Sequence, residues 1–362
     1  MQYIDEYRDK EKIISLSNRI RFESHKPMRI MEVCGGHTMA IQRFGIPSLL
    51  PDHIQLVSGP GCPVCVTDRA YIDKAIAYSR LPEVIIATYG DLIRVPGSTS
   101  TLDREKATGA DIRIVYSILD ALTLAKKNRQ KKVIFLGIGF ETTAPGSAAG
   151  IIKAQMAGLF NFYVLSAHKI MPPPMAALID QGVKIDGYIG PGHVSTVTGS
   201  SMFEFIPEKY KLGVVISGFE PLDILQSIYM LVLQHERNEP SVEIQYSRVV
   251  KPEGNPKALE LLDEVFELRD DWWRGLGVLP LSGLGIRSKY EEFDAEKMMS
   301  VDVEPTREDK GCICGSILKG VATPSDCKLF GKVCTPSDPV GACMVSNEGA
   351  CAASFRYKKN DK

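Results

Sequence analysis

The chain has 362 residues, of which 44% are hydrophobic and 24% charged, and its formal net charge is −1. This length allows two or three domains with hydrophobic cores, and the near-neutral charge argues against a nucleic-acid or anionic-membrane partner. The charged N-terminus contains no apolar signal region, and no apolar run approaches the roughly 18 residues of a membrane helix. We therefore expect a cytoplasmic protein without membrane or nucleic-acid partners.

Residues 1–27 form a predicted amphipathic helix. Its apolar side chains Ile13, Ile14, Leu16 and Ile20 form the predicted buried side. We expect this helix to pack on the third, C-terminal domain.

Residues 28–128 form a predicted first α/β domain. Helical patterns separate short apolar runs at 30–33, 54–58 and 84–88, whereas 112–115 fits either a strand or the start of a helix. Strands separated by helices indicate a parallel sheet with helical crossovers.

The first predicted strand leads into Cys34-Gly-Gly-His37-Thr38. A glycine turn between a strand and a helix brings a thiol and an imidazole out at one end of the sheet. A thiolate with a nearby imidazole can act as a nucleophile or bind a metal. The alternative is a tight turn with a buried cysteine and Thr38 as a cap.

The next glycine turn contains Cys62-Pro-Val-Cys65. Cys-x-x-Cys is the spacing of redox pairs, in which one thiolate has a lowered pKa and the other thiol resolves. Half of a metal site is the alternative, but the sequence holds no second Cys-x-x-Cys to complete it. We therefore favour a dithiol that cycles between its reduced and oxidised states.

Residues 129–238 repeat the pattern as a predicted second α/β domain. Glu141, Thr142 and Thr143 follow its first strand, and Thr143 is the predicted cap of a helix N-terminus that favours an anion such as cyanide, carbamoyl or phosphate. A plain surface carboxylate is the alternative for Glu141. The prolines at 172–174 argue against a helix or a central strand. The predicted elements are strands at 133–136, 162–165, 188–189 and 212–216 and a helix at 223–236.

Further glycine turns follow the later strands. His193 lies in Gly190-Pro-Gly-His193, another turn is Ser217-Gly-Phe-Glu-Pro221, and His168 is a weaker candidate before the prolines. Ligands of such sheets bind beyond the carboxyl ends of the strands. We therefore predict an α/β fold of two related Rossmann-like parallel-sheet domains facing a cleft. This cleft is expected to collect Cys34, His37, Cys62, Cys65, Glu141 and His193.

Residues 239–362 form a predicted third domain, with a helix at 257–273, a glycine-rich apolar stretch at 275–286, and six of the nine cysteines. In a reducing compartment such clustering points to metal binding or redox chemistry. The spacing Cys312-x-Cys314-x12-Cys327-x6-Cys334 suits zinc or an iron–sulfur cluster, and its Cys-x-Cys start favours iron–sulfur. Cys343 and Cys351 are extra thiols, which can pair with each other, be inert or help to hold the domain.

The motifs and their order resemble the hydrogenase maturation protein HypD family over about residues 10–355. The resemblance rests on Cys34-Gly-Gly-His-Thr38, Gly59-Pro-Gly-Cys-Pro-Val-Cys65, Gly139-Phe-Glu-Thr-Thr143, Gly190-Pro-Gly-His-Val-Ser195 and the six-cysteine tail. It implies two Rossmann-like domains and a third domain that holds a [4Fe–4S] cluster. The implied cluster ligands are Cys312, Cys314, Cys327 and Cys334.

The resemblance also implies a function. In this family the protein and its small partner HypC form the scaffold on which the Fe(CN)2CO unit of [NiFe]-hydrogenase is assembled as transient cargo. The position of Cys34 implies a thiolate that binds the iron jointly with HypC. Cyanide comes from HypE with HypF, and the finished unit passes to the hydrogenase large subunit. The expected protein is a redox-active assembly scaffold rather than a conventional turnover enzyme.

A mechanistic hypothesis joins the motifs. The cluster supplies single electrons, Cys62 and Cys65 store two, and His37 ligates iron, shuttles protons or holds the Cys34 thiolate. Residues 139–143, with Glu141, Thr142 and Thr143, and His193 receive the cyanide ligands. The competing interpretations are a stand-alone iron–sulfur protein-disulfide reductase and a zinc-stabilised, non-enzymatic binding module.

Overall fold

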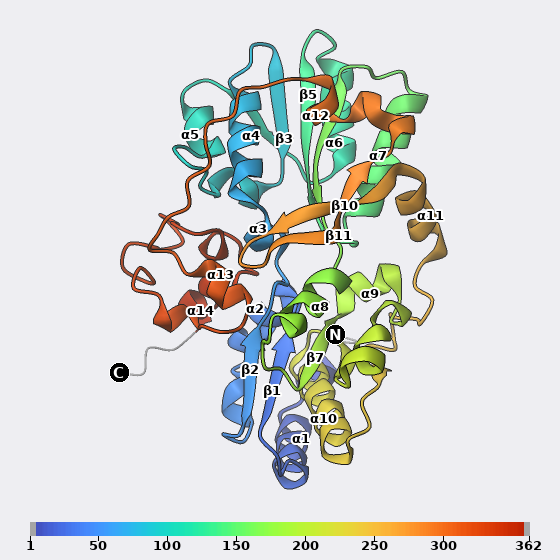
Figure 1. The fold of residues 1–362 in the computed structure, drawn as a ribbon, viewed down its shortest axis with the longest axis vertical. Helices are drawn as coiled ribbons and strands as arrows, with labels where there is room; N and C mark the ends of the chain where they lie inside the picture. Colours follow the sequence, from blue (N-terminus) through green and yellow to red (C-terminus); the bar gives the residue numbers. More distant parts are fainter. Residues whose placement is uncertain (1–4, 358–362) are drawn as a thin grey trace.

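Two parallel β-sheets lie one above the other along the long axis of the molecule (Figure 1). The computed structural model describes residues 5–357. The lower sheet has the order β2-β1-β7-β8-β9, and the upper sheet has the order β4-β3-β5-β6. Every strand pairing in both sheets is parallel, which confirms the predicted fold class. The strands are β1 (Met28–Glu32), β2 (Ile54–Ser58), β3 (Val84–Thr88), β4 (Asp111–Ile114), β5 (Lys132–Gly139), β6 (Phe162–His168), β7 (Gly187–Pro191), β8 (Gly213–Ser217) and β9 (Val242–Ile244).

The chain builds the two sheets in an interleaved order. It leaves the lower sheet after β2, forms the whole upper sheet, and returns to the lower sheet with β7, which pairs with β1. The sheets therefore do not divide at residues 128/129 as predicted. Hydrophobic periodicity shows where strands lie but does not encode which distant strands pair.

The predicted strands agree closely with the observed ones. The ranges 54–58 and 84–88 coincide with β2 and β3, and all five residues of β3 are buried, as in a parallel sheet covered on both faces. The ambiguous segment at 112–115 is mainly strand, because β4 ends at Ile114 and helix α6 (Ile118–Lys127) begins after a capping box at Ser117.

Further helices cover the sheets and carry the loops at their edges. They are α1 (Lys10–Glu23), α2 (Gly35–Arg43), α3 (Pro63–Val66), α4 (Arg69–Ser79), α5 (Leu102–Ala107), α7 (Ala144–Met156), α8 (Pro172–Asp180), α9 (Gly192–Thr198), α10 (Pro221–Arg237), α11 (Pro256–Val265), α12 (Ala295–Met298), α13 (Cys314–Leu318) and α14 (Ala350–Tyr357). Among the described residues, none of the helices has both the length and the apolar character needed to span a bilayer.

The N-terminal helix packs on α10 beside the lower sheet, so its predicted packing on the third domain is wrong (Figure 1). Helix α1 begins after Asp9, whose carboxylate accepts a hydrogen bond from the Lys12 amide. Ile20 is fully buried, whereas Ile14, also predicted to be buried, is 57% exposed. The first four residues of the predicted segment lie outside the described residues.

Two predictions about secondary structure are corrected. The prolines at 172–174 were expected to prevent a helix, but helix α8 begins at Pro172. Proline is tolerated in the first helical turn because the N–H that it lacks would have no partner inside the helix there. The predicted helix at 257–273 ends at Val265. The chain then continues as strand β10 (Phe266–Trp273), which pairs antiparallel with β11 (Gly277–Ile286).

The hairpin of β10 and β11 lies between the two sheets, and the cysteine-rich region lies beside them (Figure 1). Helix α14 contacts α2, and the short helix η8 (Ala342–Met344) contacts α3. Since α2 and α3 follow the first two strands, the C-terminal region lies against the carboxyl end of the lower sheet.

Candidate functional site

Two glycine turns approach each other at the carboxyl end of the lower sheet. Cys34 follows β1 as the residue before helix α2, and the Gly35 amide donates a hydrogen bond of 2.9 Å to the Gly61 carbonyl after β2. A side chain on Gly61 would overlap the backbone of Cys34. The sequence needs glycine here because the two turns are in direct contact, and this contact places Cys34 next to Cys62.

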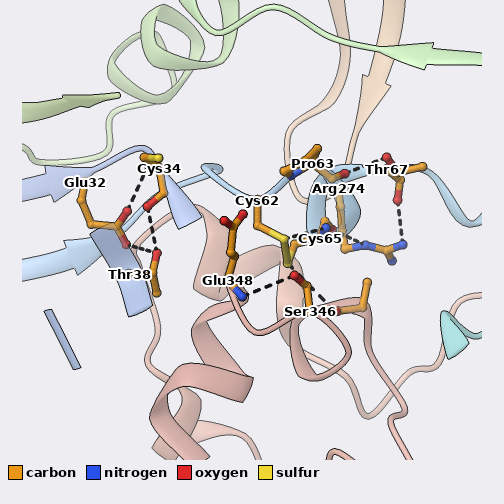
Figure 2. Close-up of a disulfide and its surroundings, with 11 residues drawn as sticks. Glu32, Cys34, Thr38, Cys62, Pro63, Cys65, Thr67, Arg274, Ser346 and Glu348 are labelled. Atoms are coloured by element: carbon orange, nitrogen blue, oxygen red, sulfur yellow. Dashed lines mark hydrogen bonds between the residues drawn. A yellow bond between two sulfur atoms is a disulfide. The ribbon is translucent and has the colours of Figure 1, made fainter. Parts of the chain in front are cut away.

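Two carboxylates flank the Cys34 thiol. Glu32, at the end of β1, accepts hydrogen bonds from the Cys34 amide at 3.2 Å and from the Thr38 hydroxyl at 2.5 Å (Figure 2). Glu348 reaches the site from the loop before α14, and a side chain on Gly35 would overlap it. Glu32 and Glu348 were not identified from the sequence, since only the fold brings them to Cys34.

Burial and mutual repulsion disfavour the negatively charged forms of Cys34, Glu32 and Glu348. Burial, followed by the charges of Glu348 and Glu32, raises the pKa of Cys34 to about 12. Burial raises the pKa of Glu32 to about 8 despite its hydrogen bonds, and it raises the pKa of Glu348 as well. Three acidic groups thus lie together, with Cys34 and Glu32 buried and Glu348 exposed at their edge. A cation bound there would stabilise their ionised forms.

His37 and His193 are brought together by an aromatic ring between β8 and α10. Phe219 stacks on the His37 ring at 4.5 Å and on the His193 ring at 3.8 Å between centroids. A side chain on Gly36 or Gly192 would approach the Phe219 ring to 2.9 or 3.2 Å, so both glycines make room for it. The sequence placed Phe219 in a glycine turn but did not mark it as a site residue.

The protonation of His37 follows from its partners. Its Nε2 lies 3.0 Å from the Gly218 carbonyl oxygen and 3.2 Å from that of Ser217, and carbonyls only accept, so Nε2 carries the proton and donates. Burial lowers the pKa of His37 to about 4. Its Nδ1 is then a buried acceptor without a hydrogen-bond partner among the described residues. His193, in contrast, is exposed.

Cys62 and Cys65 form a disulfide at the start of helix α3, with 5.2 Å between their Cα atoms (Figure 2). Both residues are buried, at 3% and 0% exposure. The Arg274 guanidinium donates hydrogen bonds of 2.9 Å to the carbonyls of Cys65 and Thr67. On the other side, the Cys65 sulfur lies 4.0 Å from the Ala342 carbonyl oxygen, which places the disulfide against the cysteine-rich region.

The four predicted cluster ligands line one small pocket in that region. Its wall also contains Cys351 and apolar side chains such as Ile317 and Met344. A side chain on Gly341 would lie 2.6 Å from the sulfurs of both Cys312 and Cys314. Glycine at this position therefore leaves space beside two thiols. The ligand residues named from the sequence are Cys312, Cys314, Cys327 and Cys334.

This donor set fits an iron–sulfur cluster, because four thiols surround a space with apolar walls. Within residues 5–357 no three His, Cys, Asp or Glu side chains converge on a point as ligands of a single metal ion would. Each thiolate of a cluster binds its own iron, so its ligands need no such convergence. Cys343 and Cys351 are free thiols, and the alternative that they pair with each other is wrong.

Glu141 is buried rather than a surface carboxylate. One of its oxygens accepts a hydrogen bond of 2.9 Å from the Met171 amide, the other has no partner among the described residues, and burial raises its pKa to about 7. Thr143 does precede helix α7, but its hydroxyl donates to the carbonyls of Ile138 and Phe140 instead of capping the helix.

The structure thus gathers Cys34, His37, the disulfide and His193 around the carboxyl end of the lower sheet. Glu141 is linked to this group only through its neighbour Phe140. Phe140, next to Glu141, packs in the same core as Cys62 and Cys65 and stacks on Trp273 at 5.9 Å. The weaker candidate His168 is buried and shares a hydrogen bond of 2.8 Å with Ser147, which is a structural contact between β6 and α7.

Comparison with known proteins identifies the family. A family model described as "HypD: Hydrogenase formation hypA family" matches residues 11–358. Over 99% of its length the chain is 48% identical to hydrogenase maturation factor HypD2 of Bradyrhizobium diazoefficiens, of which it covers 97%. It is 47% identical to HypD of Rhizobium leguminosarum bv. viciae and 46% identical to HypD of Cupriavidus necator, again over 99% of the chain and over 96% and 97% of those proteins. The chain therefore belongs to the HypD family of hydrogenase maturation factors.

Proposed function

We propose that this maturation factor assembles the Fe(CN)2CO unit of [NiFe]-hydrogenase on Cys34, which shares the iron with HypC. The observation that carries the proposal is the buried Cys34 thiol with the buried Glu32 and the exposed Glu348 beside it. Both charges that raise the pKa of Cys34 belong to carboxylates, so the thiol stays protonated until a cation arrives. An iron(II) ion binding there would take the thiolate, and thiolate is a ligand suited to soft iron that carries cyanide and CO.

The histidines have different roles in this proposal. The His37 Nδ1 lies in the first turn of the helix that Cys34 precedes, and with a pKa of about 4 it stays neutral, so its proposed role is to accept a hydrogen bond at the site. The exposed His193 ring can donate a hydrogen bond to a cyanide nitrogen as the cargo forms. The amides and hydroxyls of residues 139–143 are proposed to receive cyanide as well, with HypE and HypF as its source.

The Cys62–Cys65 pair is proposed as the redox element. Reduction of the disulfide takes two electrons and two protons and yields two thiols. A [4Fe–4S] cluster bound by Cys312, Cys314, Cys327 and Cys334 would supply electrons one at a time. The seven free cysteines suit the reducing cytoplasm, where we place the protein before it passes its cargo to the hydrogenase large subunit.

Burial of the disulfide favours this function over a stand-alone disulfide reductase. Exchange with a partner's disulfide requires a thiolate to reach a sulfur atom directly. Cys65 is fully buried and Cys62 is 3% exposed. The pair is therefore better placed to act inside the protein than on a partner's disulfide.

Infrared spectroscopy of the anaerobically purified complex with HypC tests the proposal. We expect Fe–CN and Fe–CO stretching bands from the wild-type complex and none from the Cys34→Ala variant, while the visible absorption of the cluster is the same in both. Bands of wild-type intensity in Cys34→Ala would show that the cargo is held elsewhere. The Cys34→Ser variant, which keeps the size of the side chain, controls for a packing defect.

A further inference from the structure

The backbone that holds His37 is itself held by a polar network outside the proposed mechanism. The His37 Nε2 donates to the carbonyls of Ser217 and Gly218, at the end of strand β8. The Ser217 hydroxyl donates to the same Gly218 carbonyl at 2.9 Å. A carbonyl oxygen has two lone pairs, and both of those on Gly218 therefore have a donor. The position of this one peptide thus bears directly on the His37 ring.

Gln245, directly after β9, binds the other side of the Gly218 peptide. The Gly218 amide donates a hydrogen bond of 3.0 Å to Gln245 Oε1, and Gln245 Nε2 donates one of 2.9 Å to Asp223 Oδ1. A carboxylate only accepts and a backbone N–H only donates, so these two partners determine which way the Gln245 amide is turned. Gln245 is 9% exposed and Asp223 is fully buried, so both bonds lie away from solvent.

Arg248 holds the far end of the network. Its guanidinium donates hydrogen bonds of 2.8 and 2.6 Å to the two oxygens of Asp223. It also lies over the rings of Tyr7 and Tyr246, at 4.1 and 4.4 Å from their centroids. A bidentate pair with a planar guanidinium fixes the orientation of a carboxylate as well as its distance. A side chain on Gly218 would overlap Asp223, so the oriented carboxylate lies directly against the turn.

A similar network lies at the opposite end of β8. Gln234 accepts a hydrogen bond of 3.2 Å from the Ser241 amide and donates one of 2.6 Å to Glu243. A side chain on Gly213, the first residue of β8, would overlap Gln234. Both ends of the strand are thus held by a buried glutamine between a backbone amide and a carboxylate. Only the network at the carboxyl end reaches a residue of the candidate site.

We propose that Gln245, Asp223 and Arg248 are positioning residues that hold the Gly218 peptide, and thereby keep the His37 proton on Nε2 and leave Nδ1 open as an acceptor. With the proton on Nδ1 instead, the Nε2 lone pair would face two carbonyl oxygens and gain no hydrogen bond. The buried Nδ1 has no partner among the described residues, which is the state that the network maintains. The use of Nδ1 at the iron site rests on the proposed function, whereas the tautomer is a property of the protein without cargo.

Nuclear magnetic resonance of the full-length protein, isotopically labelled at its histidine nitrogens, tests the inference. The chemical shifts of the two ring nitrogens report which one carries the proton, and the His37→Gln variant identifies the His37 signals by their loss. We expect the Nε2–H form to predominate in the wild type. In Gln245→Ala we expect the ratio of Nδ1–H to Nε2–H forms to rise about fivefold, because the Gly218 amide loses its partner.

Two further variants separate positioning from stability. Gln234→Ala removes the corresponding glutamine at the other end of β8 and should leave the ratio unchanged. Arg248→Gln removes the bidentate partner of Asp223 but keeps Gln245, so we expect a smaller rise of about twofold. Should Gln245→Ala fail to fold, judged by its circular dichroism, Arg248→Gln decides, and an unchanged ratio there overturns the inference.

Other results would also overturn it. An unchanged ratio in folded Gln245→Ala would assign the network to stability alone. A rise of equal size in Gln234→Ala would show that any weakening around β8 moves the proton, and a predominant Nδ1–H form in the wild type would contradict the tautomer itself. These measurements need neither iron nor HypC, so their failure leaves the infrared test of Cys34 intact. Missing Fe–CN bands in that test would likewise leave the tautomer result standing.

Discussion

The Cys34 site and the cysteine pocket both bury thiols, but they treat these thiols in opposite ways. At Cys34, burial and two carboxylates raise the pKa of the thiol to about 12. In the pocket, hydrogen bonds from Cys312 and two further thiols hold the pKa of Cys314 well below its usual value. The Cys34 thiol, beside two carboxylates, is expected to ionise only when a cation binds. The Cys314 sulfur, beside other thiols, is instead stabilised as a thiolate. The difference suits transient cargo at the first site and a resident cofactor at the second.

The disulfide lies between these two regions, and breaking it gives the largest expected effect. Cys62→Ser or Cys65→Ser should abolish hydrogenase maturation while the visible spectrum of the cluster stays unchanged, because the pair is separate from the ligand set. The loss of maturation is measured as the hydrogenase activity of cells carrying each variant. The state of the cluster is measured as the visible absorption of the purified protein. Full maturation in either variant would remove the disulfide from the mechanism.

Removing the carboxylates should weaken the cation preference of the Cys34 site. Glu348→Gln and Glu32→Gln each remove a carboxyl group that a bound cation would hold in its ionised form, but keep a hydrogen-bonding group. We expect the affinity for iron(II), measured by competition with a coloured chelator under anaerobic conditions, to fall by about tenfold or more. Glu291→Gln, which changes a carboxylate with 59% side-chain exposure, is the control. Equal affinities in all four proteins would contradict the electrostatic description of the site.

A smaller effect is expected from Phe219, which stacks on both histidines. Phe219→Leu loses the stacking on both histidines and an edge contact with Tyr246. An aromatic pair contributes about 0.5–1.5 kcal/mol. We expect the free energy of unfolding in urea to fall by about 1–2 kcal/mol, and the imidazole NMR signals of His37 and His193 to shift. Phe160→Leu, at a side chain that is 75% exposed, should leave both measurements unchanged. Unshifted signals in Phe219→Leu would show that the ring does not position the histidines.

Local patterns predicted much of this protein. The strands β2 and β3, the helix at α10 and the glycine turns with Cys34, Cys62 and His193 follow from periodicity and spacing, since these depend on neighbouring residues. Cysteine spacing likewise marked the four residues that line the pocket. The start of α8 and the end of α11 were missed, because a proline run and an amphipathic pattern fit more than one structure.

The tertiary structure alone decided which of these parts meet. Pairing of β7 with β1 places His193 beside the Cys34 turn, and the return of the chain after α12 brings Glu348 to Gly35. Phe219, Glu32 and Arg274 carry no motif, so only their contacts reveal them. The sequence by itself determined the chemistry that each turn carries. The order of the strands determined which groups share a buried space, and burial together with neighbouring charge sets the pKa of each group there.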